Sequence, residues 1–194
     1  MAELLGWAPD TCAEPKDRMH SDVIQTQRLV LRQLELNDAD FIVELLNEAA
    51  FLQFIGDKGV RTLDDACEYI RKGPMDSYER NGFGLYAVCL GDGTRAGICG
   101  LVKREGLGDV DVGFAFLSRH HSKGYAAESA AAILEHARRV LGLQRVVAIT
   151  SPENFGSIAV LEKIGLKFER MVRLAQDSPE LKLFGPSCSG TLHE

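Results

Sequence analysis

Hydrophobic and polar residues alternate over residues 23–34, VIQTQRLVLRQL, where the first regular pattern of the chain begins. Leu29 and Leu31 fall on one face of this segment and Arg32 on the other, which is the pattern of a half-buried β-strand. Residues 1–22 show no such period and contain two prolines. We therefore predict an N-terminal tail or arm over residues 1–22 and a folded domain that begins at residue 23.

Two segments with helical spacing follow this strand. In residues 37–55 the hydrophobic residues recur three and four positions apart, and Asn37 is placed to cap the first turn. In residues 62–73 Thr62 is placed as the cap, Asp65 completes a capping box, and Gly73 marks the predicted end. The spacing predicts two helices before the next strand.

Short hydrophobic runs separated by turn sequences occupy the middle of the chain. Residues 84–90, 95–105 and 109–117 are joined by GDGT and GLGD, which predicts an antiparallel meander. A long helix over 124–143 and a buried strand over 145–151 come next. A shorter helix over 154–165 and two last strands, 166–174 and 180–184, complete the pattern.

The order β-α-α-β-β-β-α-β-α-β-β predicts the α+β class. We expect a single central sheet that is mixed but mostly antiparallel and is flanked by helices. The predicted domain covers residues 23–184, and residues 185–194 form a predicted C-terminal tail.

Composition and charge remove several classes of function. With 194 residues, 45% hydrophobic and 26% charged, the chain has the length and composition of one soluble globular domain. A net charge of −6 and a sequence pI of about 5.4 argue against extensive contact with nucleic acid. Neither a membrane-spanning stretch nor a signal-peptide pattern is present. We expect a cytoplasmic monomer or homodimer with no nucleic-acid or membrane partner.

Cysteine and histidine spacing predicts no metal site. The five cysteines are scattered without a C-x-x-C pair, which is typical of reduced thiols in a cytosolic protein. His120 and His121 are adjacent, so their side chains diverge, and no H-E-x-x-H pattern occurs.

A strand-to-helix junction, SRHHSKGYAAES at residues 118–129, is the most informative segment. The first N–H groups of a helix lack intrahelical partners and lie at the positive end of the helix dipole. Gly124 permits close approach of a ligand to the backbone, Ala126 and Ala127 keep the first turn free of bulk, and Lys123 adds positive charge. These features predict an anion-binding helix start, whereas an ordinary turn would explain the glycine equally well on local grounds.

Competing phosphate-binding and hydrolase motifs do not fit. The P-loop pattern G-x-x-x-x-G-K-[ST] is absent. Residues 91–96, GDGTRA, match a dinucleotide-binding pattern formally, but a strand follows them instead of the required helix. No G-x-S-x-G lies between a strand and a helix, which removes serine-hydrolase chemistry.

Three segments together, QRLVLRQLELNDAD, VDVGFAFLSRHHSKGYAAES and SPENFGSIAVLEKIGLKFER, resemble the GNAT superfamily of N-acetyltransferases. Within it the chain is similar to the ribosomal-protein alanine (N-terminal) acetyltransferase branch, over about residues 23–184. The resemblance implies the GNAT fold and acetyl-CoA as co-substrate, with no metal. The cofactor motif of the family, Gln/Arg-x-x-Gly-x-Gly/Ala, corresponds to residues 121–126, where His121 replaces Gln or Arg and Ser122 replaces a common Gly.

The resemblance also implies which residues contact the cofactor. Backbone N–H groups from His121 to Ala126 would hold the pyrophosphate, Phe116 and Leu117 would lie along the pantetheine arm, and Asn154 would hydrogen-bond its amides. The full predicted set is Phe116, Leu117, His121, Ser122, Lys123, Gly124, Tyr125, Ala126 and Asn154.

Acetyl transfer to an amine needs a neutral nitrogen, a stabilised oxyanion and a proton for the departing thiolate. By resemblance Asp111 stands where many relatives carry a glutamate and is the candidate base, while N–H groups near residues 114–116 would polarise the carbonyl. Leu161 occupies the usual place of an acidic tyrosine, and Ser157 is the substitute expected in this branch. Asp111 could instead be a solvent-facing or hairpin-pairing acid, and both Asn154 and Ser157 are ordinary capping residues.

The sequence therefore favours an acetyl-CoA-dependent N-acetyltransferase that transfers acetyl directly to a primary amine. A protein N-terminal α-amino group fits, because its reference pKa of about 8 lies below that of lysine. The acidic chain suits polyamine or aminoglycoside acceptors as well. A non-catalytic acyl-CoA-binding or sensing module on the same fold is the rival interpretation. We expect the acceptor groove near Phe51, Phe54, Ile55 and Gly56, although such aromatics also serve as core.

Overall fold

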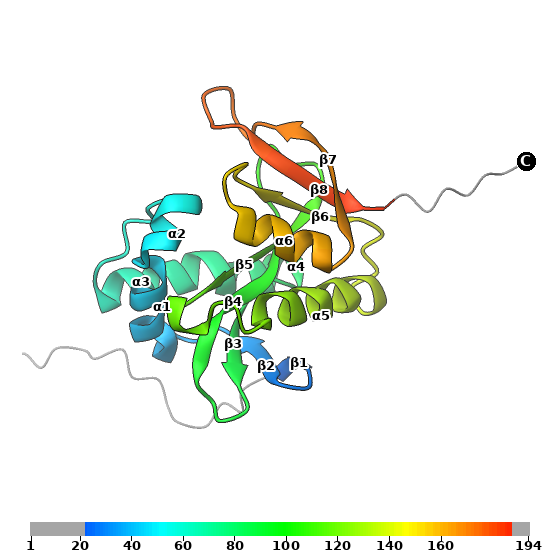
Figure 1. The fold of residues 1–194 in the computed structure, drawn as a ribbon. Helices are drawn as coiled ribbons and strands as arrows, with labels where there is room; N and C mark the ends of the chain where they lie inside the picture. Colours follow the sequence, from blue (N-terminus) through cyan, green and yellow to red (C-terminus); the bar gives the residue numbers. More distant parts are fainter. Residues whose placement is uncertain (1–21, 188–194) are drawn as a thin grey trace, which may run out of the picture.

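The structure, a computed structural model, describes residues 22–187, and these residues form one eight-stranded sheet in the order β1-β2-β3-β4-β5-β6-β8-β7 (Figure 1). The strands are β1 (Asp22–Gln25), β2 (Leu29–Gln33), β3 (Leu85–Leu90), β4 (Arg95–Val102), β5 (Val110–Phe116), β6 (Val146–Thr150), β7 (Leu166–Val172) and β8 (Leu181–Pro186). Neighbouring strands pair antiparallel except β5 and β6, which pair parallel. The predicted α+β class and the mixed, mostly antiparallel sheet are confirmed.

Helices cover both faces of this sheet. They are α1 (Ala39–Leu46), α2 (Ala49–Phe54), α3 (Leu63–Ile70), α4 (Asp76–Asn81), α5 (Tyr125–Arg139) and α6 (Phe155–Lys163), with short 3-10 turns η1 (Leu36–Asp38) and η3 (Ser118–His120) and a π-helical turn η2 (Arg71–Met75). Along β3, Tyr86 and Val88 join the core under α5 and α6, while Ala87 and Cys89 join the core under α1, α2 and α3. This two-residue alternation gives the sheet two hydrophobic cores. Figure 1 shows α5 and α6 together on one side of the strands, apart from α1, α2 and α3.

The predicted first strand is two strands. Between them the chain turns at Thr26, whose N–H donates to the carbonyl of Leu29 at 2.9 Å and whose hydroxyl oxygen accepts the N–H of Leu29 at 3.0 Å. The resulting hairpin β1-β2 places Thr26 and the following residues beside the start of α5, with consequences for the site described below.

The predicted helix over residues 37–55 is broken into α1 and α2. Asn47 ends α1, because its side-chain amide donates to the carbonyls of Val43 and Val60 at 2.7 and 2.8 Å. Asn37 lies inside η1 and does not cap the helix, so that prediction is wrong. Asp38 holds the turn instead, since its carboxylate accepts the N–H of residue 35 at 3.0 Å.

The predicted helix over residues 62–73 begins as expected but does not end at Gly73. Thr62 and Asp65 form the capping box, with N–H to oxygen distances of 3.2 and 2.9 Å. The chain then continues through η2 into α4, which ends before Gly82 at φ 75°. Pro74 is buried within η2. Packing of this segment against the sheet therefore overrides the local stop signal.

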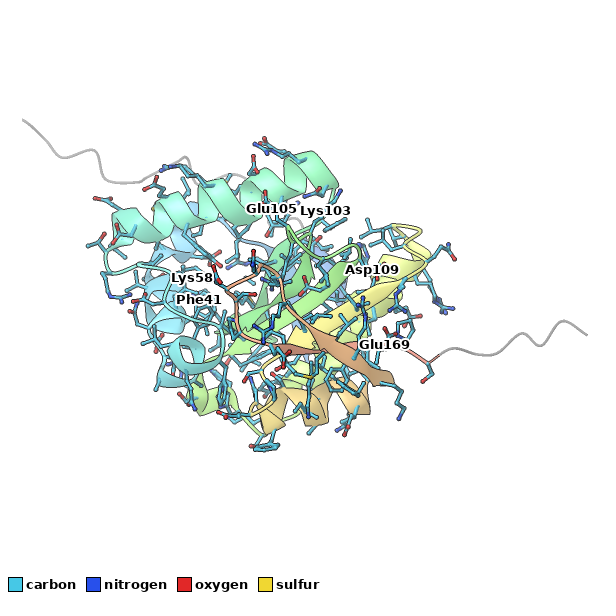
Figure 2. All side chains as sticks on the ribbon, turned by 90° about the horizontal axis from the view of Figure 1, so that it is seen from above. Phe41, Lys58, Lys103, Glu105, Asp109 and Glu169 are labelled. Atoms are coloured by element: carbon cyan, nitrogen blue, oxygen red, sulfur yellow. The ribbon has the colours of Figure 1, made fainter. Side chains whose placement is uncertain are left out.

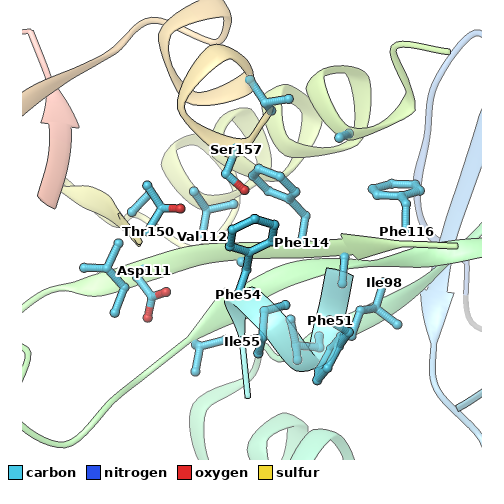
Figure 3. Close-up of a pocket in the computed structure, with 18 of the residues that line it drawn as sticks. Phe51, Phe54, Ile55, Ile98, Asp111, Val112, Phe114, Phe116, Thr150 and Ser157 are labelled. Carbon is cyan, nitrogen blue, oxygen red and sulfur yellow. The ribbon is translucent and has the colours of Figure 1, made fainter. Parts of the chain in front are cut away.

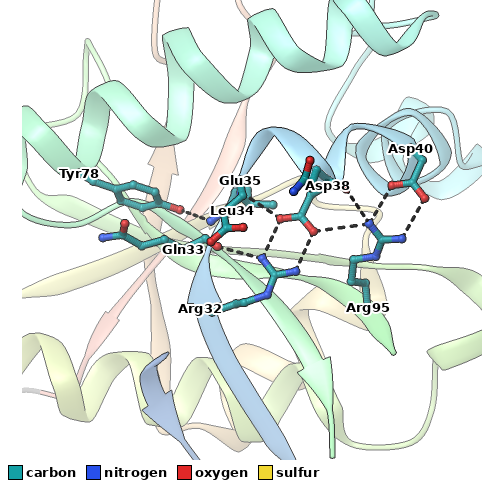
Figure 4. Close-up of polar contacts among 9 residues, drawn as sticks. Arg32, Gln33, Leu34, Glu35, Asp38, Asp40, Tyr78 and Arg95 are labelled. Atoms are coloured by element: carbon teal, nitrogen blue, oxygen red, sulfur yellow. Dashed lines mark hydrogen bonds and ion pairs between the residues drawn. The ribbon is translucent and has the colours of Figure 1, made fainter. Parts of the chain in front are cut away.

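A buried carboxylate joins the end of β2 to the start of α1 (Figure 4). Asp38 is 2% exposed and accepts hydrogen bonds from both terminal nitrogens of Arg32, each at 2.7 Å. Arg95 lies 3.5 Å from the same carboxylate and pairs with Asp40 at 2.7 Å. The Asp38 carboxylate also raises the pKa of the Arg32 guanidinium by accepting its hydrogen bonds. This network fixes the start of α1 to β2 and β4.

The predicted tails are outside the described residues for most of their length. Residues 1–21, with Trp7, and residues 188–194 are not described. The described strands begin at Asp22 and end at Pro186, slightly beyond both ends of the predicted domain. The division into tail, domain and tail therefore stays a prediction. Within residues 22–187, the structure has no helix whose length and apolar character suit a membrane span.

Candidate active site

β5 and β6 separate within the sheet and leave a cavity between them. Their parallel pairing covers only Val110 with Val146 and Asp111 with Val147. Beyond this point β5 pairs with β4 and β6 with β8. The cavity has a volume of about 1510 Å³ and is lined by both strands, the start of α5, the start of α6, and residues of α2, α3 and α4 (Figure 3). The edge of β5 from residue 112 to residue 116 consequently has no strand partner on the β6 side.

One end of the cavity is the start of α5, where the predicted anion-binding loop lies. Gly124 is the N-cap of α5 and has a φ of 82°, a conformation that favours glycine. The His121 ring lies with Nε2 2.8 Å from the carbonyl of Phe116, and the His121 N–H donates to Ser118 at 3.1 Å. The His121 N–H is therefore already used, and within the described residues the unbonded N–H groups begin at Ser122. This shortens the predicted donor run by one residue.

Arg28 holds this loop from the β1-β2 hairpin. Its guanidinium donates to the carbonyl of Lys123 at 3.0 Å and to Glu128 at 2.7 Å, and it lies 4.9 Å from the centre of the Tyr125 ring. The Thr26 hydroxyl donates to the same Glu128 carboxylate at 2.6 Å. Sequence reasoning missed Arg28 because its partners lie about a hundred residues away, with no local pattern to mark them. The loop is thus fixed in shape by contacts that leave its first N–H groups unbonded.

Ser122 adopts a left-handed conformation at φ 59°, the one positive φ outside glycine in the described chain. A residue other than glycine pays about 1–2 kcal/mol of backbone strain in this region, and replacing it with glycine removes that strain. Glycine also gives the unfolded chain more backbone entropy, which offsets part of the gain in stability. We expect Ser122→Gly to raise the free energy of unfolding by about 0.5–1 kcal/mol, measured by chemical denaturation. A destabilised variant would show that the Ser122 side chain contributes more than its strain costs.

His120 is a buried imidazole directly before the loop. Its side chain is 8% exposed, and neither ring nitrogen has a hydrogen-bond partner in the described structure. Burial lowers the pKa of His120, and the nearby cations Lys123 and Arg119 lower it further, against smaller opposing effects of Asp92 and Glu44. The neutral form is therefore favoured in the folded protein.

A depressed pKa makes His120 a source of acid instability. Below the unfolded-state pKa of about 6.5 the unfolded chain binds a proton that the folded chain does not, so stability falls as pH decreases. We expect His120→Phe to lose less stability than the wild type between pH 7 and pH 5, measured as the shift in melting temperature. Equal losses in the two proteins would assign the acid sensitivity to other groups, such as His136, whose pKa burial also lowers.

The other end of the cavity holds a buried carboxylate. Asp111 is 1% exposed, and its Oδ1 accepts a hydrogen bond from Nε of Arg104 at 2.9 Å. Burial raises the pKa of Asp111, and the Arg104 guanidinium opposes this in part. Oδ2 has no hydrogen-bond partner among the described residues. Sequence reasoning missed Arg104, although the predicted hairpin marks it: Val102 pairs with Asp111, so Arg104 falls on the same face two residues later.

The candidate proton donor and the candidate base lie on opposite sides of β5. Figure 3 shows Ser157 above the strand on the side of α6, and the Asp111 carboxylate below it on the side of α2. Both residues line the cavity, as does Asn154. Asn154 also caps α6, with its Oδ1 accepting the N–H of Ser157 at 3.0 Å. Leu161, 1% exposed, also lines the cavity.

Most of the predicted cofactor residues line the cavity, but two side chains do not. Phe116, His121, Ser122, Gly124, Tyr125 and Ala126 are lining residues. Leu117 is fully buried in the core under α1, because successive strand residues point to opposite faces. Lys123 presents its carbonyl to Arg28 and is not a lining residue.

The predicted acceptor groove corresponds to the α2 side of the cavity. Phe51, Phe54 and Ile55 line it, whereas Gly56 does not. Phe51 also belongs to the core under α1, α2 and α3, so its core role is confirmed, whereas its part in an acceptor groove stays a prediction. Within residues 22–187 no three His, Cys, Asp or Glu side chains come together as a metal site would require.

Comparison with known proteins identifies the family. Residues 28–167 match the family model described as Acetyltransferase (GNAT) domain. The chain is 32% identical over 147 residues to the uncharacterized N-acetyltransferase YnaD of Bacillus subtilis, covering 75% of this chain and 83% of that protein. An acetyltransferase of the GNAT family from Bacillus anthracis superposes with a TM-score of 0.69 at 26% identity, covering 84% of this chain and 96% of the other.

A more distant structure shares the fold. The ribosomal L7/L12 α-N-protein acetyltransferase RimL, in complex with coenzyme A, has a TM-score of 0.74 at 16% identity, with 85% of this chain and 97% of RimL covered. The separated strands, the open start of α5 and these matches agree. The chain belongs to the GNAT family of acetyltransferases.

Proposed function

We propose that the protein transfers acetyl directly from acetyl-CoA to a primary α-amino group. The observation that carries this proposal is a single cavity, in the gap between β5 and β6, whose two ends differ in chemistry. Unbonded N–H groups at the start of α5 form one end, and the buried Asp111 carboxylate forms the other. RimL, which shares this fold, binds coenzyme A in its solved complex, and this supports acetyl-CoA as the acetyl donor here.

The residues at the α5 end fit a pyrophosphate. N–H groups from Ser122 to Ala127, at the positive end of a 15-residue helix, would bind its oxygens. Gly124 lets the ligand approach, and Arg28 keeps the loop in shape. The unpaired edge of β5 offers backbone groups to the pantetheine amides, in the manner of an added strand. When bound, acetyl-CoA supplies an acetyl group activated as a thioester.

Asp111 and Ser157, on the two sides of β5, are the proposed proton-transfer groups. Oδ2 of Asp111 accepts one proton from the incoming ammonium group, which frees the nitrogen lone pair to form the new C–N bond. As the C–S bond breaks, Ser157 is the proposed donor of its hydroxyl proton to the departing sulfur. The second proton that leaves the nitrogen restores the Ser157 hydroxyl, so that one proton ends on the thiol of CoA and the proton held by Asp111 is released. N–H groups of residues 114–116 are the proposed oxyanion donors.

The products are an N-acetylated amine, CoA thiol and one released proton. No covalent bond to the protein is needed. The buried thiols Cys89 and Cys99, which form no disulfide, support a cytoplasmic location for this activity.

Thermal-shift titration with acetyl-CoA, CoA and ATP tests the donor site. We expect both CoA species to raise the melting temperature and ATP to have little effect. Gly124→Glu places bulk and negative charge on the loop, where a Cβ already meets Arg28 at 3.3 Å, and is expected to abolish the shift.

Gly142→Glu is the matched control. Gly142 also has a positive φ, 68°, but lies in the loop after α5 with open space around it. It is expected to lower the basal melting temperature as Gly124→Glu does while retaining the CoA-induced shift. If acetyl-CoA at millimolar concentration stabilises neither the wild type nor this control, the proposed function is wrong.

A further inference from the structure

We propose that the acceptor is an α-amino acid with a free carboxylate and an apolar side chain. This inference rests on the proposed function and narrows its substrate class. Its basis is the ion pair of Asp111 and Arg104 together with the charges and apolar side chains around it.

The ion pair leaves Oδ2 of Asp111 and both terminal nitrogens of Arg104 available to a ligand. Asp111 uses Oδ1 and Arg104 uses Nε in their mutual hydrogen bond, and no described residue accepts from the two terminal nitrogens of Arg104. Nη2 lies 4.0 Å from the position a Cβ would take on Gly113, so the guanidinium extends along β5 beside the gap. Both residues line the cavity. The reacting end therefore presents a carboxylate oxygen and a guanidinium fork side by side.

A zwitterion is the ligand that complements such a pair. An ammonium group within hydrogen-bond reach of Oδ2 would also lie near Arg104, and two cations at that separation repel each other. A carboxylate two bonds from the nitrogen removes this repulsion and gives the terminal nitrogens of Arg104 an acceptor. Arginine binds carboxylates with particular strength because its fork matches both oxygens.

Other charged residues at this end also favour an anionic group on the acceptor. The charged residues that line the cavity are Lys58, Asp76, Arg80, Lys103, Arg104, Glu105 and Asp111, together with Glu153 and Lys163 from the α6 region. Arg80 pairs with Asp76 at 2.8 Å, while Lys58, Lys103 and Glu105 have no ion-pair partner in the described structure. In the view from above, Lys58 lies on the α2 side of the molecule and Lys103 and Glu105 lie on the side of the β4-β5 connection (Figure 2). The net charge of these lining residues is positive, which disfavours polyamine and aminoglycoside acceptors although the whole chain is acidic.

Apolar side chains complete the surroundings of the pair. Phe54 and Ile55 line the cavity on the side of β5 to which the Asp111 carboxylate points (Figure 3). Tyr69 lines the same end, and burial raises the pKa of its hydroxyl, which keeps it a neutral donor. An acceptor anchored by its ammonium and carboxylate would place its side chain against these aromatic and aliphatic groups.

The experiment compares matched acceptors in an assay of free-thiol release from acetyl-CoA. Phenylalanine, leucine and methionine are each supplied as the free acid, the amide and the decarboxylated amine, with spermidine as a polycation. We expect kcat/KM for the acids to exceed that for their amides and amines by about 10- to 100-fold, the size of a charge-assisted hydrogen bond. From the free acids the product is an N-acetylamino acid, with one CoA thiol and one proton released for each acetyl group transferred.

Arg104→Gln distinguishes recognition from a structural role. We expect it to reduce the acid-over-amide ratio to about one-tenth or less of its wild-type value, whereas Arg80→Gln, whose cation Asp76 already neutralises, keeps that ratio. Faster acetylation of amides, decarboxylated amines or spermidine, or transfer to none of the acids, would overturn the substrate class. The CoA-induced thermal shift and transfer to any amine would in that case still uphold the proposed function. If the wild type shows neither the CoA-induced thermal shift nor transfer to any amine, the proposed function and the proposed substrate class are both wrong.

Discussion

Replacing Asp38 with alanine is expected to lower the free energy of unfolding by about 3–5 kcal/mol, because it leaves a buried cation without its partner. Asp38 is 2% exposed and holds both terminal nitrogens of Arg32. It also accepts the N–H of Glu35, so its loss removes a hydrogen bond that holds the turn before α1. Urea denaturation monitored by circular dichroism measures the change.

Two further variants keep this prediction testable if Asp38→Ala does not fold. Asp38→Asn retains the shape and one acceptor oxygen, and a smaller loss is expected from it. Asp57→Ala breaks an exposed pair with Arg61, in which both side chains are more than half exposed, and a far smaller loss of stability is expected from it. Similar losses from Asp38→Ala and Asp57→Ala would show that burial of the network contributes nothing.

Replacing Asp111 with asparagine is expected to lower kcat/KM by about 10²–10⁴-fold, the usual contribution of a general base. Asparagine keeps the size of the side chain and an oxygen for Arg104 but cannot take a proton. Asp111→Glu, which restores a carboxylate, should retain more activity than the asparagine variant. The CoA-induced thermal shift should persist in both variants, because the donor end of the cavity is unchanged.

The pH profile gives a second readout for Asp111. Burial raises its pKa, so the active carboxylate form is lost as pH falls through a value above the ordinary carboxyl pKa of about 3.9. We expect kcat/KM to rise with pH through this limb in the wild type and to lack the limb in Asp111→Asn. Unchanged activity and an unchanged limb in Asp111→Asn would remove Asp111 from the chemistry.

Much of the fold follows from local patterns. Period-two alternation and turn residues predict β3, β4 and β5, and the apolar stripe before Gly142 predicts α5. The sequence predicts that a helix ends at Gly73, but the chain continues through Pro74 into α4. Packing on the sheet outweighs the low helix propensity of this one glycine. Asn37 failed as a cap for a similar reason, since the buried Asp38 organises the turn.

Some residues of the candidate site could also be predicted from the sequence, and others could not. The positions of Gly124 and Asp111 follow from the motif and its resemblance to the family. Arg28 could not be predicted, because its contact with Glu128 joins elements that are adjacent only in the folded sheet. Arg104 could have been predicted, because the register of the β4-β5 hairpin places it beside Asp111. Leu117 shows the limit of a linear motif, because strand alternation turns it into the opposite core.

The most direct test of the proposed function measures N-acetylated product and free CoA thiol together, with acetyl-CoA and the amine panel, for wild type and Gly124→Glu. The proposed function predicts one acetylated amine for each thiol released by the wild type, and neither product from Gly124→Glu. Acetyl-CoA that stabilises the wild type without any acetylated amine would contradict the proposed transfer and support an acyl-CoA-binding module.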